Sequence, residues 1–479
     1  MIKTSHFPQL ILALGLILTT PLTAQKISIQ FTTTPTSTPS VSKAVLRYDK
    51  DFAYSFTLDD ATIDAVTAAL PVLKGGLVRA NGTTFSGLFY TDGCGNSLPF
   101  KAGIAWNSAN QFGIDVHSGN VADQLTWGQL DTLYDEGWDV MNHSFSHKSR
   151  WLFPMTDANY RDEIEQNNIA LRTKTRRKLE SPAFIVPAND DAYHPFAFAA
   201  GHKIIFDQSA STIGYGGLRV DGNPNLYQLK VHRMYLNDIY QRTVPQFIDT
   251  VALRARNGAK IWYNEFSHRI DDFSTSGTGY NFYYFKSHLE SIANQYGKTG
   301  ADRMWMAPLQ EVYEYLVVGQ TYYATPQLVG NQLEMNFNFS QVPKWVRRKA
   351  VTLVVNSAVD FTNVTVPAGV KMTFRGTGNQ KIINLDFTGV AVGTNDATED
   401  PSVLRLFPNP AIDILSVDCP TMKTGEVTAR IFDISGKLLY QKDFDSSKFP
   451  LPTAALASGI YFLKISQGDK IVNGKFVKE

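Results

Sequence analysis

The chain has little cysteine and little net charge. Cys94 and Cys419 are the two cysteines among 479 residues, and their separation rules out a local disulfide framework or a thiolate metal site, so we interpret both as free. The 45 Lys and Arg residues almost balance the 44 Asp and Glu residues, which leaves a formal charge of +1. This balance argues against a chain-wide basic surface, and therefore against nucleic acid as a partner.

Long apolar runs are also lacking. The run at residues 9–18 is about half as long as the ~20 residues that a membrane-spanning helix needs, and no other segment reaches that length. Because Lys3 precedes this run and the small residue Ala24 follows it, residues 1–24 are predicted to be a secretory signal peptide rather than a membrane anchor.

The rest of the chain is long enough for several domains. Residues 25–43 are rich in Ser, Thr and Pro and are expected to form an extended linker or edge. Strand-like and helix-like runs alternate over residues 44–318, which indicates an α/β domain; for example, a strand at 51–58 precedes a helix at 63–73, and a helix at 157–179 precedes a strand at 183–186. Residues 325–393 read as a small accessory β-sandwich, and a polar linker follows at 393–400.

Polar clusters follow four of the predicted strands of the α/β domain. The ends of parallel strands share one rim, where such folds build active sites, so these clusters are expected to meet. They are Asp59 with Asp60, His143 with His147, Asn189 with Asp190 and Asp191, and His268.

Three of these side chains suit a metal ion. His143 and His147 are four positions apart, so one compact loop or helical turn can direct both imidazoles to a common point, and Asp60 would complete a three-ligand site. Each residue also has a structural alternative. One histidine could cap a loop while the other lies on the surface, the two aspartates could cap the next helix, and His268 could belong to the core.

The motifs as they stand resemble the NodB-homology polysaccharide deacetylases. The string Phe56-Thr-Leu-Asp-Asp60 is similar to the first motif of that family, His143-Ser-Phe-Ser-His147 to the second, and Phe266-Ser-His268 to the fifth. The resemblance implies a distorted (β/α) barrel in which Asp59 is the general base, His268 is the general acid, and Asp60, His143 and His147 bind a divalent metal, most simply Zn2+.

The sequence departs from this family at two motifs. The stretch Phe184-Ile-Val-Pro187 has no Arg ahead of its proline, where relatives carry the residue that orients the base; Asn189, Lys148 or Arg150 could replace it. The stretch Phe206-Asp-Gln208 lacks the Trp of the fourth motif. Asn189, Asp190 and Trp305 are candidates for contacting the substrate. Asn189 and Asp190 could equally lie in a solvated turn. Trp305 could stack on a sugar or pack into the rim.

The C-terminal region resembles another known family. The pieces Leu404-Arg-Leu-Phe-Pro-Asn-Pro410, Asp433-Ile-Ser-Gly436, Ser458-Gly-Ile-Tyr461 and Lys475-Phe-Val-Lys478 are similar to the C-terminal sorting domain of proteins exported by the type IX secretion system. Residues 400–479 are therefore expected to form a second small all-β sandwich, which places the protein outside the cell or on its surface; an adhesive or carbohydrate-binding sandwich is the alternative.

The sequence as a whole predicts a secreted, metal-dependent deacetylase acting on N- or O-acetyl groups of a polysaccharide, with the secretion machinery as its other partner. Two alternatives stay open at this point. One is a glycan-binding pseudo-enzyme or adhesin, suggested by the missing Arg and Trp, and the other is a metal-dependent hydrolase of a non-glycan amide.

Overall fold

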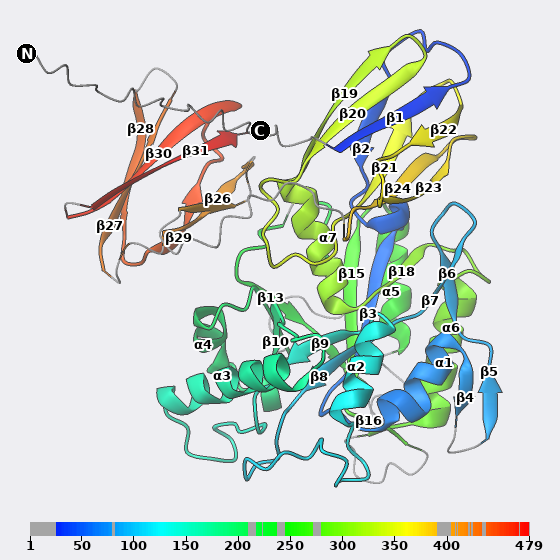
Figure 1. Cartoon of the computed structure of the whole chain (residues 1–479), viewed down its shortest axis with the longest axis vertical. Helices are drawn as coiled ribbons and strands as arrows, with labels where there is room; N and C mark the ends of the chain where they lie inside the picture. Colours follow the sequence, from blue (N-terminus) through cyan, green and yellow to red (C-terminus); the bar gives the residue numbers. More distant parts are fainter. Residues whose placement is uncertain are drawn as a thin grey trace, which may run out of the picture.

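Figure 1 shows the computed structural model of the chain. It describes residues 25–78, 82–208, 217–222, 224–236, 245–271, 279–389, 404–407, 409, 411–419, 422, 425–433, 437–468 and 470–478. The predicted signal peptide and the predicted 393–400 linker lie outside these residues. Among the described helices, none combines the length and the apolar character that crossing a membrane requires.

The centre of the α/β domain is a nearly closed, barrel-like sheet of parallel strands. Its order is β12-β15-β3-β8-β9-β10-β11-β13, and β14, which follows β13 after the single residue Arg233, pairs with β15 and so brings the sheet back to its start. Strand β12 is antiparallel to β15, and β18 pairs with the first half of β3. The strands are β3 (Phe52–Leu58), β8 (Gly103–Trp106), β9 (Asp139–Asn142), β10 (Ala183–Ile185), β11 (Ile204–Asp207), β12 (Leu218–Arg219), β13 (Leu229–His232), β14 (Met234–Tyr235), β15 (Ile261–Ser267) and β18 (Met304–Met306).

The sequence explains why these strands occupy the centre. Every residue of β3 and of β15 is buried, as expected for parallel strands that are covered on both faces. Helices α2, α3, α5 and α7 pack against the sheet, and capping boxes at Thr126 and Thr156 begin α2 and α3. The helices are α1 (Leu70–Lys74), α2 (Trp127–Asp135), α3 (Asp157–Lys174), α4 (Tyr193–Ala199), α5 (Pro245–Arg256), α6 (Phe282–Tyr296) and α7 (Leu309–Thr321), with single turns η1 (Arg47–Asp49), η2 (Ala65–Ala69) and η3 (Pro187–Asn189).

The α/β domain also contains three two-stranded sheets among the described residues. They pair β4 (Gly76–Val78) with β5 (Thr83–Phe85), β6 (Phe89–Thr91) with β7 (Ser97–Pro99), and β16 (Arg269–Asp271) with β17 (Gly279–Asn281).

The segment expected to be a linker contributes two strands to the accessory β-sandwich. Strand β1 alternates buried and exposed residues and pairs with β20 and β22, while β2 pairs with β21, so 25–43 is structured and not a free linker. The two sheets have the orders β19-β20-β1-β22 and β2-β21-β24-β23. The strands are β1 (Gln25–Phe31), β2 (Ser40–Lys43), β19 (Tyr323–Val329), β20 (Gln332–Asn338), β21 (Ala350–Asn356), β22 (Phe361–Thr365), β23 (Lys371–Arg375) and β24 (Lys381–Asp386).

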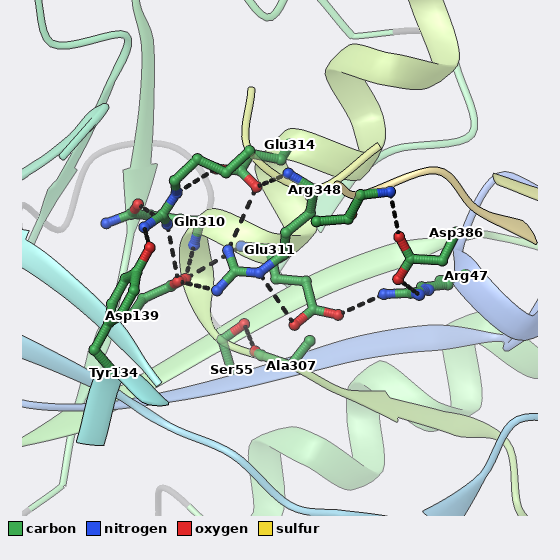
Figure 2. Close-up of polar contacts among 12 residues, drawn as sticks. Arg47, Ser55, Tyr134, Asp139, Ala307, Gln310, Glu311, Glu314, Arg348 and Asp386 are labelled. Atoms are coloured by element: carbon green, nitrogen blue, oxygen red, sulfur yellow. Dashed lines mark hydrogen bonds and ion pairs between the residues drawn. The ribbon is translucent and has the colours of Figure 1, made fainter. Parts of the chain in front are cut away.

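A partly buried ionic network joins this sandwich to the amino-terminal end of the central sheet (Figure 2). Arg348 donates to Asp139, the first residue of β9, at 2.6 Å, and Arg47 donates to Glu311 of α7 at 2.8 Å. The Asp139 carboxylate also accepts the backbone N–H groups of Gln310 and Glu311, and so caps α7.

The C-terminal domain has a core of its own. The sheets β25-β26-β29 and β28-β27-β30-β31 enclose a separate apolar cluster that includes Leu415, Ile431 and Ile465. Its strands are β25 (Arg405–Phe407), β26 (Ile414–Asp418), β27 (Val427–Phe432), β28 (Leu438–Phe444), β29 (Lys448–Pro452), β30 (Gly459–Gln467) and β31 (Lys470–Lys478). The structure therefore confirms a mixed α/β domain accompanied by small all-β domains.

Candidate active site

The carboxyl end of the central sheet brings together Asp60, which follows β3, and the two histidines that follow β9. Oδ1 of Asp60 lies 3.6 Å from Nε2 of His143 and 3.6 Å from Nε2 of His147. The three potential ligand atoms all lie within 4.8 Å of one another. Two donors bound to one Zn2+ at about 2.0–2.1 Å with tetrahedral angles are roughly 3.4 Å apart, so this spacing fits a divalent ion.

The backbone turns sharply at Asp60 and within the loop from His143 to His147. Asp60 has φ 68° and the next residue, Ala61, has φ 51°, both in the left-handed region that non-glycine residues seldom occupy. Ser144 and His147 have φ 66° and 55°. Adjacent residues of an extended strand point to opposite faces, whereas this turn lets Asp59 and Asp60 face one centre. Strained backbone of this kind concentrates at functional sites.

His143 is oriented as a metal ligand would be. Its Nδ1 lies 3.0 Å from the carbonyl oxygen of Ile185, so Nδ1 carries the proton and donates it, which leaves the lone pair on Nε2. Nε2 is buried and has no hydrogen-bond partner among the described residues. Burial lowers the pKa of His143 to about 4, so the imidazole is neutral near pH 7. A buried, neutral nitrogen directed at a carboxylate is the donor that a cation needs.

The loop between the two histidines is fixed by its own hydrogen bonds. Ser144 Oγ accepts the backbone N–H of His147 at 3.0 Å, so this hydroxyl helps to hold the shape of the loop. Glu163 of α3 accepts both the backbone N–H of Ser146 at 2.8 Å and its hydroxyl at 2.5 Å. The imidazole positions are thus set before any ligand arrives.

Asp59 makes a buried bidentate ion pair that the sequence motifs do not reveal. Arg233, between β13 and β14, donates from Nη1 and Nη2 to the two carboxylate oxygens, each at 2.8 Å, and neither residue is more than 1% exposed. The guanidinium carbon lies 4.1 Å from the ring centroid of Phe266. Burial alone would raise the pKa of Asp59, but the charge and hydrogen bonds of Arg233 outweigh burial and lower it.

Arg233 therefore places beside Asp59 a guanidinium that the stretch before Pro187 does not supply. The three replacements considered from the sequence are engaged elsewhere. Arg150 pairs with Asp190 and Asp191, Lys148 lies 3.8 Å from Glu163, and Asn189 accepts the backbone N–H of Gln208. A lone arginine between two short apolar strands was the one available signal for Arg233, and nothing in its spacing linked it to Asp59.

His268 follows β15 and lies on the same rim. The backbone N–H of Asp59 donates to the carbonyl oxygen of Ser267 at 2.8 Å, which joins the two strand ends. Burial alone would raise the pKa of Asp60, but the nearby His147 and, to a smaller extent, His268 lower it. The His268 ring packs edge-on against Tyr235 at 5.0 Å, an aromatic contact that sequence reasoning missed. Its Nδ1 is buried without a hydrogen-bond partner among the described residues.

Two of the substrate-side candidates, Trp305 and Asp190, are fully buried. Trp305 is fully buried on β18, which pairs with the first half of β3 and so lies toward the far end of the sheet. Asp190 is fully buried and accepts hydrogen bonds from the Arg150 backbone and from the Tyr160 hydroxyl. The burial of these two side chains depends on pairing register and buried ion pairs, which are not visible in local sequence. Asn189, at φ 56°, is the last residue of the single turn η3 that follows β10.

Comparison with known proteins identifies two segments of the chain. Residues 48–190 match the polysaccharide deacetylase family, and residues 405–479 match the secretion system C-terminal sorting domain. The first match contains Asp59, Asp60, His143 and His147. No curated protein matches the chain.

Three solved structures are similar over parts of the chain. The deacetylase PplD of Streptococcus pyogenes, solved with acetate, is 14% identical over 39% of this chain and 79% of its own, with a TM-score of 0.26. An immunoglobulin-like β-sandwich protein of the DUF3244 family from Bacteroides vulgatus is 22% identical over 16% of this chain and 84% of its own, with a TM-score of 0.14. PorZ, a surface component of the type IX secretion system of Porphyromonas gingivalis, is 17% identical over 22% of this chain and 15% of its own, with a TM-score of 0.15. These low scores add nothing to what the family matches establish.

The two family matches assign a segment of each of two domains. The α/β domain carries a polysaccharide deacetylase segment, and the C-terminal domain is a type IX sorting domain, which indicates export to the cell surface.

Proposed function

We propose that this chain is a secreted, metal-dependent deacetylase that hydrolyses N- or O-acetyl groups of a polysaccharide, and that its nearly closed sheet is the distorted (β/α) barrel of that enzyme class. The observation that carries the proposal is the convergence on one rim of a metal-competent trio and a buried carboxylate held by arginine. The trio can bind metal, and the second carboxylate stays free to accept a proton.

Asp60, His143 and His147 are the residues that would hold the ion. One carboxylate oxygen and two imidazole nitrogens suit Zn2+, and three protein ligands leave coordination positions open for water and substrate. When bound, such an ion supplies Lewis-acid polarisation of the acetyl carbonyl and lowers the pKa of water.

Asp59 would act as the general base. Its lowered pKa keeps the carboxylate ionised at neutral pH, and the two hydrogen bonds from Arg233 fix its orientation. Its Oδ2 lies 3.8 Å from His143 Nε2, so the carboxylate is beside the residues that would hold the metal. There it could accept a proton from a water molecule as that water attacks the acetyl carbonyl carbon. An ionised, positioned acceptor of this kind contributes ~10²–10⁴-fold to rate.

His268 would act as the general acid. It directly follows β15, the strand that pairs with β3, and its ring packs edge-on against Tyr235. A proton on the imidazole would be delivered to the departing amine or alcohol as the acetyl carbon–heteroatom bond breaks. The Arg233–Asp59 pair also favours catalysis over the pseudo-enzyme alternative. Of the two missing residues that suggested this alternative, the arginine has a replacement in space, Arg233.

Acetate release tests this proposal. The full chain, loaded with Zn2+, is expected to release acetate from at least one of chitin oligomers, peptidoglycan or acetylated xylan, and His143→Ala is expected to abolish the release. His202→Ala is the matched control, because His202 is also a buried histidine but hydrogen-bonds to Ser181 away from the site. If no polysaccharide yields acetate, or if His143→Ala retains the wild-type rate, the proposal is wrong.

A further inference from the structure

An exposed tryptophan lies just beyond the histidine loop. Trp151 is four positions after His147 and is 60% exposed, which is unusual for the largest apolar side chain. We propose that Trp151 is a stacking subsite for a sugar unit next to the acetylated one, so that the substrate is a glycan of at least two linked sugars. This inference rests on the proposed function, because it takes the rim around His147 to be where a glycan binds.

The ring of Trp151 makes a cation–π contact with the neighbouring Arg150. The guanidinium carbon of Arg150 lies 4.4 Å from the ring centroid of Trp151. Arg150 is itself held by Asp191 at 2.6 Å from Nη2 and by the fully buried Asp190 at 3.2 Å from Nε. The tryptophan thus rests on a guanidinium that two carboxylates hold in place.

The backbone of this segment is equally constrained. Asp190 accepts the backbone N–H of Arg150 at 2.8 Å, and the Tyr193 hydroxyl donates to the carbonyl oxygen of Lys148 at 2.7 Å. The carbonyl oxygen of the buried Ser149 accepts the backbone N–H groups of Leu152 and Phe153 at 3.1 and 3.0 Å. An exposed aromatic residue on an ordered segment loses little conformational freedom on binding, which is the property of a preformed binding platform.

The chemistry of the platform favours a sugar. The C–H face of a pyranose ring is apolar, and the electron-rich face of an indole is a good surface for it, while the sugar hydroxyls can remain in water. A short chain segment that carries a metal ligand at one end and the platform at the other relates the two sites to a single substrate. A unit bound on Trp151 would hold its neighbour over the metal ligands, so the tryptophan is expected to lower KM for polymers and not to alter the chemical step.

The test compares substrates that do and do not reach the platform. Chitin pentamer and acetylated xylan are the long probes, and 4-nitrophenyl acetate is the short one. For Trp151→Ala in the full chain, KM for the long probe is expected to rise about tenfold with kcat nearly unchanged, a loss typical of one aromatic stacking contact. The short probe should keep its kcat/KM within about twofold.

Leu152→Ala is the matched control. Leu152 is the adjacent residue and is 68% exposed, but it has no ring and is expected to leave both probes unchanged. Trp151→Phe should give an intermediate KM, because part of the stacking surface remains. A KM within twofold of wild type for Trp151→Ala, or the same rise for Leu152→Ala, would overturn the inference while leaving the deacetylase proposal intact.

Binding separates the inference from the proposed function. Retardation of the chain in a gel that contains the same polysaccharide can be measured with Asp59→Asn, with and without Trp151→Ala. If no acetate is released from any polymer but retardation depends on Trp151, the subsite stands and the proposed reaction fails. If retardation is the same with Trp151→Ala, or if there is none, the subsite is wrong.

Discussion

Replacing Arg233 offers the sharpest test of how the candidate base is organised. Asp59 is 1% exposed. In Arg233→Gln its carboxylate would lose both 2.8 Å hydrogen bonds and its counter-charge. Removing one partner of a buried ion pair costs about 3–5 kcal/mol, because the other charge is left uncompensated. The unfolding free energy of the metal-free protein is expected to fall by that amount in urea titrations.

The same substitution should change the pH dependence of activity. Arg233 is what holds the pKa of Asp59 below its usual range against the effect of burial, so without Arg233 the pKa of Asp59 rises. The carboxylate is then protonated at a higher pH, and acetate release is expected to fail first on the acidic side of the pH–rate profile. At neutral pH a loss of ~10²-fold or more in kcat is expected if the base is fully misplaced.

Two control variants identify the cause. Arg219→Gln breaks an ion pair of similar bidentate geometry with Asp221, but Arg219 is 66% exposed, so little change in unfolding free energy is expected. The double variant Arg233→Met/Asp59→Asn removes both buried charges and should recover much of the stability without recovering activity. An Arg233→Gln protein with wild-type stability and wild-type kcat would refute the assigned role of Arg233.

Three further outcomes follow from the site and the domain arrangement. Asp59→Asn should retain Zn2+, measured by atomic emission, while kcat falls ~10²–10⁴-fold; unchanged kcat would place the base elsewhere. Burial lowers the pKa of His143 from 6.5 to about 4, so this histidine binds a proton less readily in the folded protein than in the unfolded one. The unfolding free energy of the metal-free protein should therefore fall by up to about 3 kcal/mol as the pH falls from 6.5 to 4. In urea titrations, His143→Gln should make the unfolding free energy less dependent on pH over this range. Truncation after residue 396 should leave Zn2+ binding and acetate release unchanged, because the C-terminal domain has its own core; loss of either would make that domain part of the enzyme.

The sequence predicts the residues of the candidate site better than the residues that hold them in place. Asp59, Asp60, His143 and His268 could be predicted to meet because each follows a buried strand, and the ends of parallel strands share a rim. Arg233 could not be predicted, since it lies 174 positions from Asp59 and reaches it through closure of the sheet between β11 and β15. Pairing over long sequence separations is set by register and not by local pattern.

The same reason explains the errors at the edges of the domains. Strand β1 reads locally as the start of a polar linker, but its partners β20 and β22 lie some three hundred residues later in the chain. Trp305 follows the expected strand-to-helix pattern, yet β18 pairs with the beginning of β3 and not with its end, which buries the indole away from the rim. Local motifs thus identify chemistry, while long-range pairing decides which side chains reach it.

The metal content of purified protein tests the central claim most directly. After treatment with a chelator, incubation with Zn2+ and dialysis, the full chain is predicted to retain one Zn2+ per molecule. His147→Ala is predicted to retain much less, because one of the three ligand atoms is lost. His202→Ala should retain as much as wild type. Equal Zn2+ content in wild type, His147→Ala and His143→Ala would contradict the assignment of this rim as the metal site.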